Sequence, residues 1–400
     1  KNEVQEMENY GAEAGSAVKL LQELLNLGYR KNASDIHLEP QEDRMVVRMR
    51  LDGTLLHVRE YDKEMHQPLV TRAKVLRMDI AKKRVPQDGH FKEMIDGICL
   101  DVRTSVVPTI FGEKMVLRLL NMKTEIDHGK TFGMREKNYE KMKRILRSPG
   151  GILYLTGPTG CGKTTTLYLI LEYLLRQPVN IVTIEDPVER YLPGISQMQV
   201  NEQAGLTFES GLRSVLRQDP DIIMVGETRD PETAKISVRA AITGHLVLST
   251  LHTNDAPSAV DRLRDIGVEP WLISGALRGV VSQRLVRRIC PHCKRAYHPA
   301  SDELALLGLD DAPDLVFYKG EGCPDCHHTG YTGRRAVFEI LMIDAPLRRL
   351  ITAGASADEL ADEARRHGFT TMRERCRDLV LRGETTAEEA ARTISSTIES

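Results

Sequence analysis

The sequence lacks the features that mark membrane-spanning, secreted and nucleic-acid-binding proteins. No uninterrupted apolar run approaches the roughly 18 residues that a bilayer-spanning helix needs. The first residues contain no apolar core of a secretory signal, and because the chain does not begin with Met we expect it to be part of a longer protein. The net charge of −2 argues against a dedicated nucleic-acid-binding protein, whose footprint is strongly basic.

Cysteine is scarce, and its spacing argues against a disulfide framework. Of the seven cysteines, four form two C-P-x-C pairs and the other three stand alone at positions 99, 161 and 376. An odd count with this pairing favours a reducing cytosol, in which thiols stay free or bind a metal ion.

What the sequence does contain is enough apolar material for more than one folded core. Its 41% hydrophobic and 28% charged residues are typical of an ordinary soluble protein. Four hundred residues exceed the size at which a single core usually stops growing, so we expect two or more domains.

The N-terminal third predicts a helix followed by a small antiparallel sheet. Apolar side chains recur at helical spacing over residues 17–29. They alternate over residues 44–51, and Asp52-Gly53 supplies the turn of a hairpin into residues 54–58. Further elements are expected nearby, a helix at 69–80 and strands at 98–106 and 114–119.

The rest of the chain predicts an α/β domain. Beyond a polar stretch with Gly129 and Gly133, apolar strands at 152–156, 180–185, 221–226 and 245–251 alternate with helical segments such as 163–176. This order favours a parallel sheet with helices on both faces. The expected domains are an N-terminal helix and linker at 1–33, a small α+β domain at 34–122, a linker at 123–133 and an α/β domain at 134–400. The last includes a cysteine region at 285–335 and a helical region at 344–400, with helices near 344–353, 357–367, 369–382 and 386–398.

One eight-residue segment is the most specific motif of the chain. Gly157-Pro158-Thr159-Gly160-Cys161-Gly162-Lys163-Thr164 fits the phosphate-binding pattern G-x-x-x-x-G-K-[ST] without a mismatch, between a predicted strand and a predicted helix. Its glycines let backbone N–H groups surround a polyphosphate, and the helix N-terminus adds a favourable dipole. Lys163 can reach the outer phosphates, Thr164 offers its hydroxyl to Mg²⁺, and the adjacent Thr165 is grouped with the nucleotide-binding residues.

Polar side chains also follow the other predicted parallel strands. Glu185 and Asp186 end one strand, Glu227 follows a second and His252 a third. Because parallel strands deliver their carboxyl ends to one crevice, we expect these side chains near the phosphate loop. Asp186 or Glu185 would hold Mg²⁺ through water, and Glu227 would orient or deprotonate the attacking water. His252 would sense the γ-phosphate or contact a neighbouring subunit, whereas a core histidine and solvated strand ends are the plainer alternatives.

Two C-x-x-C pairs predict a structural zinc site. Cys290 and Cys293 form the first pair and Cys323 and Cys326 the second, with 29 residues between the pairs. Four thiolates are the tetrahedral set that structural Zn²⁺ prefers, and they leave no open position for catalysis. Two unrelated thiol pairs or a redox pair remain the alternative. Neighbouring histidines are expected to be bystanders.

Two further features each leave two interpretations open. Cys161 lies beside a helix N-terminus and Lys163, so one hypothesis is a reactive thiol that ATP protects; the other is a small buried filler. A group of basic side chains near the cysteine region is either a docking face for an acidic partner or a solvated surface. Its members are Arg284, Arg287, Arg288, Lys294 and Arg295.

Four motifs together carry a family resemblance that extends over nearly all of the chain. The chain resembles the secretion superfamily ATPases, in particular the extension-type motors of type II secretion and type IV pilus assembly. In terms of that family, the Walker A motif is residues 157–164, the aspartate box 183–189, the Walker B region 216–227 and the histidine box 244–254. Gly226 replaces the Asp that precedes the Walker B glutamate in other phosphate-loop enzymes, as is usual in this family.

The resemblance implies a fold, ligands and partners. It implies a RecA-like phosphate-loop domain behind a PAS-like domain, assembled as a homo-hexamer, with ATP, Mg²⁺ and structural Zn²⁺. Family arginines at the positions of Arg103 and Arg118 reach the nucleotide from the small domain, and a guanidinium fork suits phosphate oxygens. The implied partners are an inner-membrane platform protein and a membrane-anchored docking protein, with no nucleic acid. The implied location is the cytoplasmic face of the inner membrane.

Three functions follow from these patterns. The leading hypothesis is a motor that hydrolyses ATP and drives pilus or pseudopilus assembly through the platform protein. A nucleic-acid motor or a type IV secretion translocation motor is the second, although no basic, aromatic-lined groove is evident. A scaffold that binds ATP without turnover is the third, and the presence of both Lys163 and Glu227 disfavours it.

Overall fold

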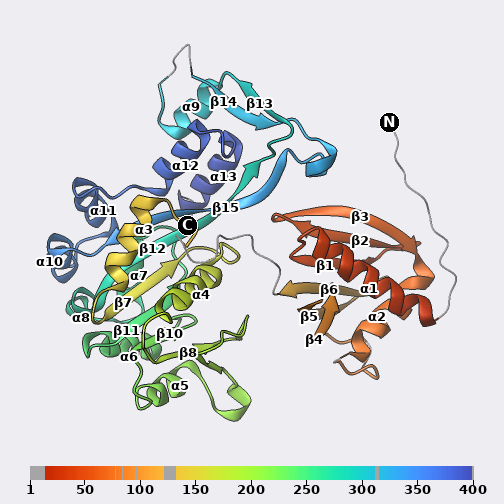
Figure 1. Cartoon of the computed structure of the whole chain (residues 1–400), viewed down its shortest axis with the longest axis horizontal. Helices are drawn as coiled ribbons and strands as arrows, with labels where there is room; N and C mark the ends of the chain where they lie inside the picture. The colour runs from red at the N-terminus through yellow and green to blue at the C-terminus, as the bar shows by residue number, and fades with distance from the viewer. Residues whose placement is uncertain are drawn as a thin grey trace. The chain divides into compact units, whose positions relative to one another are not determined.

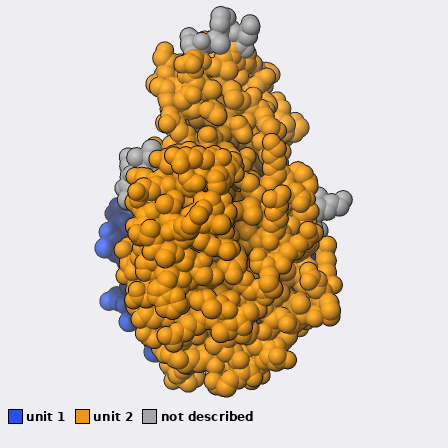
Figure 2. All heavy atoms as spheres, turned by 90° about the vertical axis from the view of Figure 1, so that its left-hand side faces the viewer, with its two compact units in different colours: residues 1–124 blue, residues 125–400 orange. Residues whose placement is uncertain are grey.

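The computed structural model describes residues 14–76, 78–82, 84–95, 97–120, 132–310 and 315–398. The chain divides into two compact units, residues 1–124 and residues 125–400 (Figure 2). Each unit is described below by itself. Among the described residues, no helix combines the length and the apolar composition that a bilayer crossing requires.

Unit 1 contains a six-stranded antiparallel sheet in the order β3-β2-β1-β6-β5-β4 (Figure 1). Its elements are α1 (Ala14–Arg30), β1 (Asp35–Pro40), β2 (Arg44–Leu51), β3 (Thr54–Asp62), α2 (Lys63–Val75), β4 (Gln87–Ile95), β5 (Ile98–Thr109) and β6 (Gly112–Leu120). The antiparallel sheet agrees with the sequence expectation, and the PAS-like character of this unit stays a prediction.

Alternation along the strands explains the core of unit 1. Met45, Val47 and Met49 of β2 are fully buried, and they share one core with apolar side chains of both helices. Leu24 of α1 belongs to this core, so the helix that we expected to lie with a linker at 1–33 packs on the sheet of unit 1. The helix expected at 69–80 begins and ends earlier, and strands β1 and β4 were not predicted from the sequence.

Unit 2 is built on a seven-stranded sheet in the order β15-β12-β7-β11-β10-β8-β9. Its strands are β7 (Gly151–Thr156), β8 (Ile181–Glu185), β9 (Ser196–Gln199), β10 (Ile222–Val225), β11 (Leu246–Leu251), β12 (Leu277–Ile289) and β15 (Tyr331–Met342), with β13 (Lys294–Tyr297) and β14 (Phe317–Gly320) forming a separate pair. Its helices are α3 (Glu136–Leu146), α4 (Lys163–Leu174), α5 (Phe208–Val215), α6 (Pro231–Ile242), α7 (Ser258–Asp265), α8 (Pro270–Ala276), α9 (Ser301–Leu307), α10 (Ala345–Ala353), α11 (Ala357–Arg366), α12 (Met372–Leu381) and α13 (Ala387–Ile398).

Both faces of the large sheet are covered, as the strand–helix alternation predicted. Ile152 and Tyr154 of β7 pack in one core with α5, α6, α7 and α8, whereas Leu153 and Leu155 pack in the opposite core with α3 and α4. The sheet is mixed rather than purely parallel, because β15 pairs antiparallel with β12. The chain leaves the sheet after β12, forms the cysteine region and returns along the same edge as β15 (Figure 1).

Candidate functional site

Four neighbouring parallel strands deliver their carboxyl ends to one edge of the large sheet. These strands are β7, β11, β10 and β8, which pair in that order. The phosphate loop follows β7, His252 follows β11, Glu227 follows β10 and Asp186 follows β8. The order of strands therefore brings together the motifs that the sequence places far apart.

The phosphate loop has the backbone conformation that its glycines permit. Gly157 has φ 139° and Gly162 has φ 90°, and α4 begins directly afterwards at Lys163. The buried Lys163 Nζ donates hydrogen bonds to the carbonyl oxygen of Gly157 at 2.6 Å and to that of Pro158 at 3.1 Å. Burial lowers the pKa of Lys163. Thr164 lies half-buried in the first turn of α4, where its hydroxyl could hold Mg²⁺.

Gln283 of β12 supports the phosphate loop, and no sequence pattern predicts this role. Its side chain is buried, accepts a hydrogen bond from the Thr166 hydroxyl at 2.8 Å and donates one to the Cys161 carbonyl at 2.8 Å. A Cβ atom added to Gly162 would lie 2.8 Å from Gln283 Nε2. The glycine at this position therefore allows both the left-handed turn and the close approach of the supporting strand.

Glu227 and His252 face each other at the carboxyl ends of β10 and β11. His252 Nε2 lies 3.7 Å from Glu227 Oε2, and Arg229 pairs with the other carboxylate oxygen at 2.5 Å. Burial and the charge of Lys163 lower the pKa of His252, so the imidazole is neutral near pH 7. A Cβ atom at Gly226 would lie 3.3 Å from the Ile184 carbonyl oxygen, which leaves little room for the Asp common in other phosphate-loop enzymes.

The two acidic residues at the end of β8 are in different environments. Glu185 is buried, and its carboxylate accepts hydrogen bonds from the Tyr168 hydroxyl, from the Thr183 hydroxyl at 2.5 Å and from the Gln197 amide at 3.1 Å. Asp186 is exposed. Protein donors thus satisfy Glu185, and Asp186 is the carboxylate of this pair with access to a hydrated metal ion.

The structure contradicts the hypothesis that Cys161 is an activated thiol. Its side chain is only 4% exposed. Burial raises the pKa of the Cys161 thiol and outweighs the opposing charges of Lys163 and Arg284. Cys161 is thus the buried filler of the phosphate loop, and the helix N-terminus does not make it reactive.

Arg103 and Arg118 lie directly opposite each other in the sheet of unit 1. The same cross-strand row continues to Asp35 and Arg50 on one side and to His90 on the other. Arg118 Nε donates to Asp35 Oδ1 at 2.9 Å, and Arg50 Nε lies 3.8 Å from the same carboxylate. Like charges at opposed positions repel each other, and an anion placed between Arg103 and Arg118 would reduce that repulsion.

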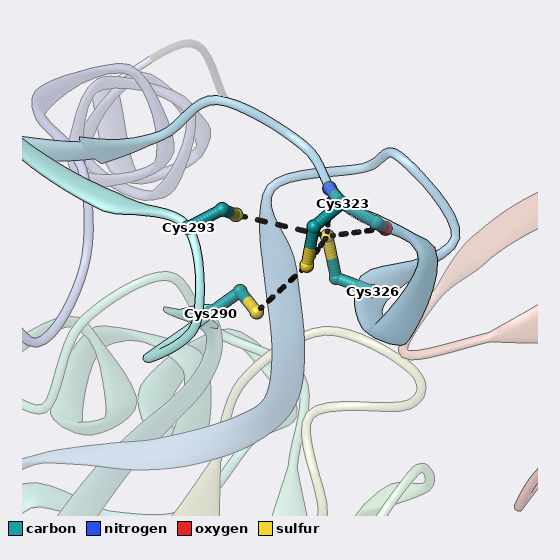
Figure 3. Close-up of side chains that lie close together, drawn as sticks. All are labelled: Cys290, Cys293, Cys323 and Cys326. Atoms are coloured by element: carbon teal, nitrogen blue, oxygen red, sulfur yellow. Dashed lines mark hydrogen bonds between the residues drawn. The ribbon is translucent and has the colours of Figure 1, made fainter.

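The four paired cysteines converge as the sequence predicts (Figure 3). Their sulfur atoms all lie within 4.8 Å of one another, and the separations are 3.8 Å for Cys290–Cys323, 3.9 Å for Cys293–Cys326 and 3.7 Å for Cys323–Cys326. Tetrahedral coordination with Zn–S bonds of about 2.3 Å requires sulfurs about 3.8 Å apart. The arrangement therefore fits Zn²⁺, and no histidine joins the cluster among the described residues.

Backbone groups hold these sulfurs in the way that metal-binding knuckles require. Gly322 N–H donates to Cys293 Sγ at 3.3 Å, and Cys323 N–H and Gly330 N–H donate to Cys326 Sγ at 3.2 and 3.3 Å. Such bonds favour the thiolate form that binds a metal. The site is closed by four protein ligands, which favours a structural role.

The basic group near the cysteine region is not a single surface. Arg284 is buried, at 4% exposure, and Arg287 pairs with the buried Glu389 at 2.7 Å. Lys294 donates to the Gly383 carbonyl at 2.7 Å. Of the five residues, Arg288 and Arg295 are classed as exposed, so neither interpretation drawn from the sequence fits the whole group.

Comparisons with known proteins agree over nearly the whole chain. A family model described as "Type II/IV secretion system protein" matches residues 11–392. The chain is 48% identical over 376 residues to type II secretion system protein E of Pseudomonas aeruginosa, and this match covers 94% of the chain and 75% of that protein. It is 47% identical over 383 residues to type IV pilus assembly ATPase PilB of Thermus thermophilus, covering 95% of the chain and 43% of that protein.

Solved structures extend the likeness to the fold. The pilus retraction motor PilT with bound ADP matches with a TM-score of 0.63 and 26% identity, covering 93% of this chain and 96% of that one. The Legionella pneumophila ATPase DotB matches with a TM-score of 0.71 and 21% identity, covering 98% of each chain, and at that identity it shows the shared fold alone.

Proposed function

Because the chain belongs to the family of type II/IV secretion system proteins and is an ATPase of that family, we propose that it is a motor that couples ATP hydrolysis to the assembly of a pilus or pseudopilus. One observation carries the proposal. Four adjacent parallel strands bring a complete phosphate loop, an acidic residue suited to water activation and a histidine to one edge of the sheet.

The residues at this edge of the sheet have separate roles in phosphoryl transfer. Backbone N–H groups of the phosphate loop, residues 157–164, bind the phosphates together with the ammonium group of Lys163. To reach the phosphates, Lys163 must break its hydrogen bonds to the carbonyl oxygens of Gly157 and Pro158. Thr164 would hold Mg²⁺ directly and Asp186 through water, and the ion would neutralise phosphate charge. Glu227 orients the attacking water once Arg229 releases its carboxylate. His252 lies beside Glu227, where its neutral ring can contact the γ-phosphate.

Arginines of unit 1 complete the proposed site. The row formed by Arg103, Arg118 and Arg50 supports a phosphate contact, since it places three guanidinium groups on neighbouring strands and a guanidinium fork matches phosphate oxygens. We propose that these arginines act in a homo-hexamer, where an arginine from one subunit reaches the nucleotide of another. Their contacts would form and break with each ATP cycle and so convert hydrolysis into domain movement.

The wider assignments rest on the relatives. The proposed partners are an inner-membrane platform protein and a membrane-anchored docking protein, and the proposed location is the cytoplasmic face of that membrane. The tetracysteine site would bind structural Zn²⁺ and keep the cysteine region folded.

The test is the steady-state ATPase activity of Glu227→Gln, with Glu232→Gln as the matched control. Glu232 lies in the first turn of α6 and is about half exposed, so its loss should leave the rate unchanged. Loss of a general base at position 227 should lower kcat by about 100-fold or more, while ATP binding persists.

Two results would overturn parts of this account. A Glu227→Gln variant with the wild-type rate would remove the water-orienting role of Glu227. Strong stimulation of the wild-type ATPase by single-stranded DNA would favour a nucleic-acid motor instead.

A further inference from the structure

Arg284 is a buried cation that forms no close ion pair among the described residues. It lies on β12 with 4% of its surface exposed, and the carboxyl groups of Glu339 and Asp255 act on it only at longer range. Its Nε is buried and has no hydrogen-bond partner. Burying a guanidinium without a close ion pair is unfavourable, so a purely structural site would be expected to have an apolar side chain here.

The guanidinium touches two parts of the nucleotide site at once. Its Nη2 donates to the carbonyl oxygen of Asn254 at 2.6 Å, and Nη1 donates to that of Gln283 at 3.0 Å. A Cβ atom added to Gly157, the first residue of the phosphate loop, would lie 2.9 Å from Nη1. Arg284 therefore packs directly behind the loop while it holds the segment after β11, which contains His252.

A second buried ionisable side chain holds the same segment. Glu339 of β15 is opposite Ser282 in the β12–β15 ladder, and its carboxylate accepts hydrogen bonds from the N–H groups of Ala256 at 2.7 Å and Met372 at 2.6 Å. Residues 252–257 are thus held by the Arg284 guanidinium at Asn254 and by the Glu339 carboxyl group at Ala256. Ser282 adds a weaker contact to the Asn254 carbonyl at 3.3 Å.

We propose that Arg284 is a positioning residue of the ATPase site, which holds the histidine segment, residues 252–257, against the start of the phosphate loop. This inference rests on the proposed ATPase function. The charge of Arg284 is also felt by Lys163, so it adds to the positive potential that attracts phosphates. The planar guanidinium group positions the histidine segment, because it donates hydrogen bonds in two directions at once. Its positive charge contributes part of the affinity for the nucleotide.

Two substitutions separate these contributions. Arg284→Lys keeps the charge but cannot donate in the same two directions, so KM for ATP should stay near the wild-type value while kcat falls by about tenfold. Arg284→Gln loses the charge as well, so KM should also rise several-fold. Arg288→Gln removes an exposed arginine from the same strand and should change neither constant.

A readout apart from activity reports the position itself. Hydrogen exchange of the peptide that spans residues 251–257 should be faster in both Arg284 variants and unchanged in Arg288→Gln, because the anchored segment opens more often. The fraction of protein able to bind a fluorescent ADP analogue corrects both kinetic constants for misfolded material. Ser282→Ala, which weakens the same carbonyl contact, should lower kcat by about twofold and does not depend on the stability of the arginine variants.

The outcomes separate this inference from the proposed function. A wild-type protein without ATPase activity would overturn both. An active wild type with unchanged kcat and KM per binding site in Arg284→Gln, or with unchanged exchange over residues 251–257, would overturn the positioning role alone. If neither Arg284 variant folds, unchanged kcat in Ser282→Ala would overturn it.

Discussion

The phosphate loop and the cysteine cluster both adjoin strand β12, but different interactions stabilise them. β12 passes behind the phosphate loop at Gln283 and ends one residue before Cys290. The loop stands between two large apolar cores, one on each face of the sheet. The cysteines form a buried cluster of their own, in which no apolar side chain other than cysteine takes part among the described residues. The first site depends on the fold of the whole unit, and the second would depend on the metal ion that we propose for it.

Lys163→Ala should have the largest effect and should act on one site only. Loss of the ammonium from the phosphate loop is expected to lower kcat/KM for ATP by about 100-fold or more. Zinc content should stay at one ion per chain, since the cysteine ligands are unaffected. ATPase assays and metal analysis of the same preparation measure both. Undiminished ATP consumption would break the assignment of this loop as the site of hydrolysis.

Removal of the metal should give the reverse result. Structural zinc contributes roughly 10 kcal/mol to the folding of small metal-binding motifs, so chelation should increase hydrogen exchange over residues 290–331. The peptide that contains the phosphate loop should keep its protection. Cys323→Ser should behave like the chelated protein, whereas Cys99→Ser, at an exposed thiol in unit 1, should not. A purified protein without zinc would refute the metal assignment.

The sequence predicted the cysteine cluster and most of the sheet edge because both follow from local patterns. C-x-x-C spacing and G-x-x-x-x-G-K-T are contiguous motifs, and polar residues after apolar runs mark strand ends. The burial of Gln283, Arg284 and Glu339 could not be predicted in this way, since nothing in the neighbouring sequence distinguishes a buried polar or charged side chain from an exposed one. The mixed character of the sheet was also missed, because the direction of β15 depends on how the chain returns from the cysteine region.

Glu339 lies in the β12–β15 pair, which extends from the phosphate loop to the cysteine cluster, and its ionisation should make stability depend on pH. Burial raises the pKa of its carboxyl to about 7, against the opposing effects of the Ala256 and Met372 N–H groups and the charge of Arg284. Its ordinary value is 4.5. Between these values the folded state retains a proton that the unfolded state has lost, so stability falls as pH rises from 4.5 to 7, by about 3 kcal/mol in total.

Glu339→Gln should remove this part of the pH dependence. Urea unfolding at pH 5.5 and pH 7.5, with about the same metal loading, measures the difference between variant and wild type. The wild type should lose more stability than the variant over this interval. Equal losses would mean that Glu339 is ionised throughout and is more strongly paired than the structure indicates.

Cys161→Ser should have the smallest effect and sharpens the contrast between the cysteines. Because its thiol is buried and its pKa is raised, alkylation by iodoacetamide should be slower at Cys161 than at the exposed Cys99. The serine variant should keep its ATPase rate within about twofold of wild type, since the position contributes packing rather than chemistry. Rapid alkylation of Cys161 that ATP prevents would instead restore the reactive-thiol hypothesis.

The long ladder between β12 and β15 has a mechanical consequence. Its register runs from the pair Gly279 and Met342 to the pair Ile289 and Tyr331, and its hydrogen bonds lie perpendicular to the strands. A pull on the cysteine end directed along the strands would load these bonds in shear, so many of them would have to break together. A pull across the strands would separate them one at a time, like a zipper. The outer edge of this sheet is therefore strong along one axis and weak along another, which sets the direction in which an external load can be borne without unravelling the fold.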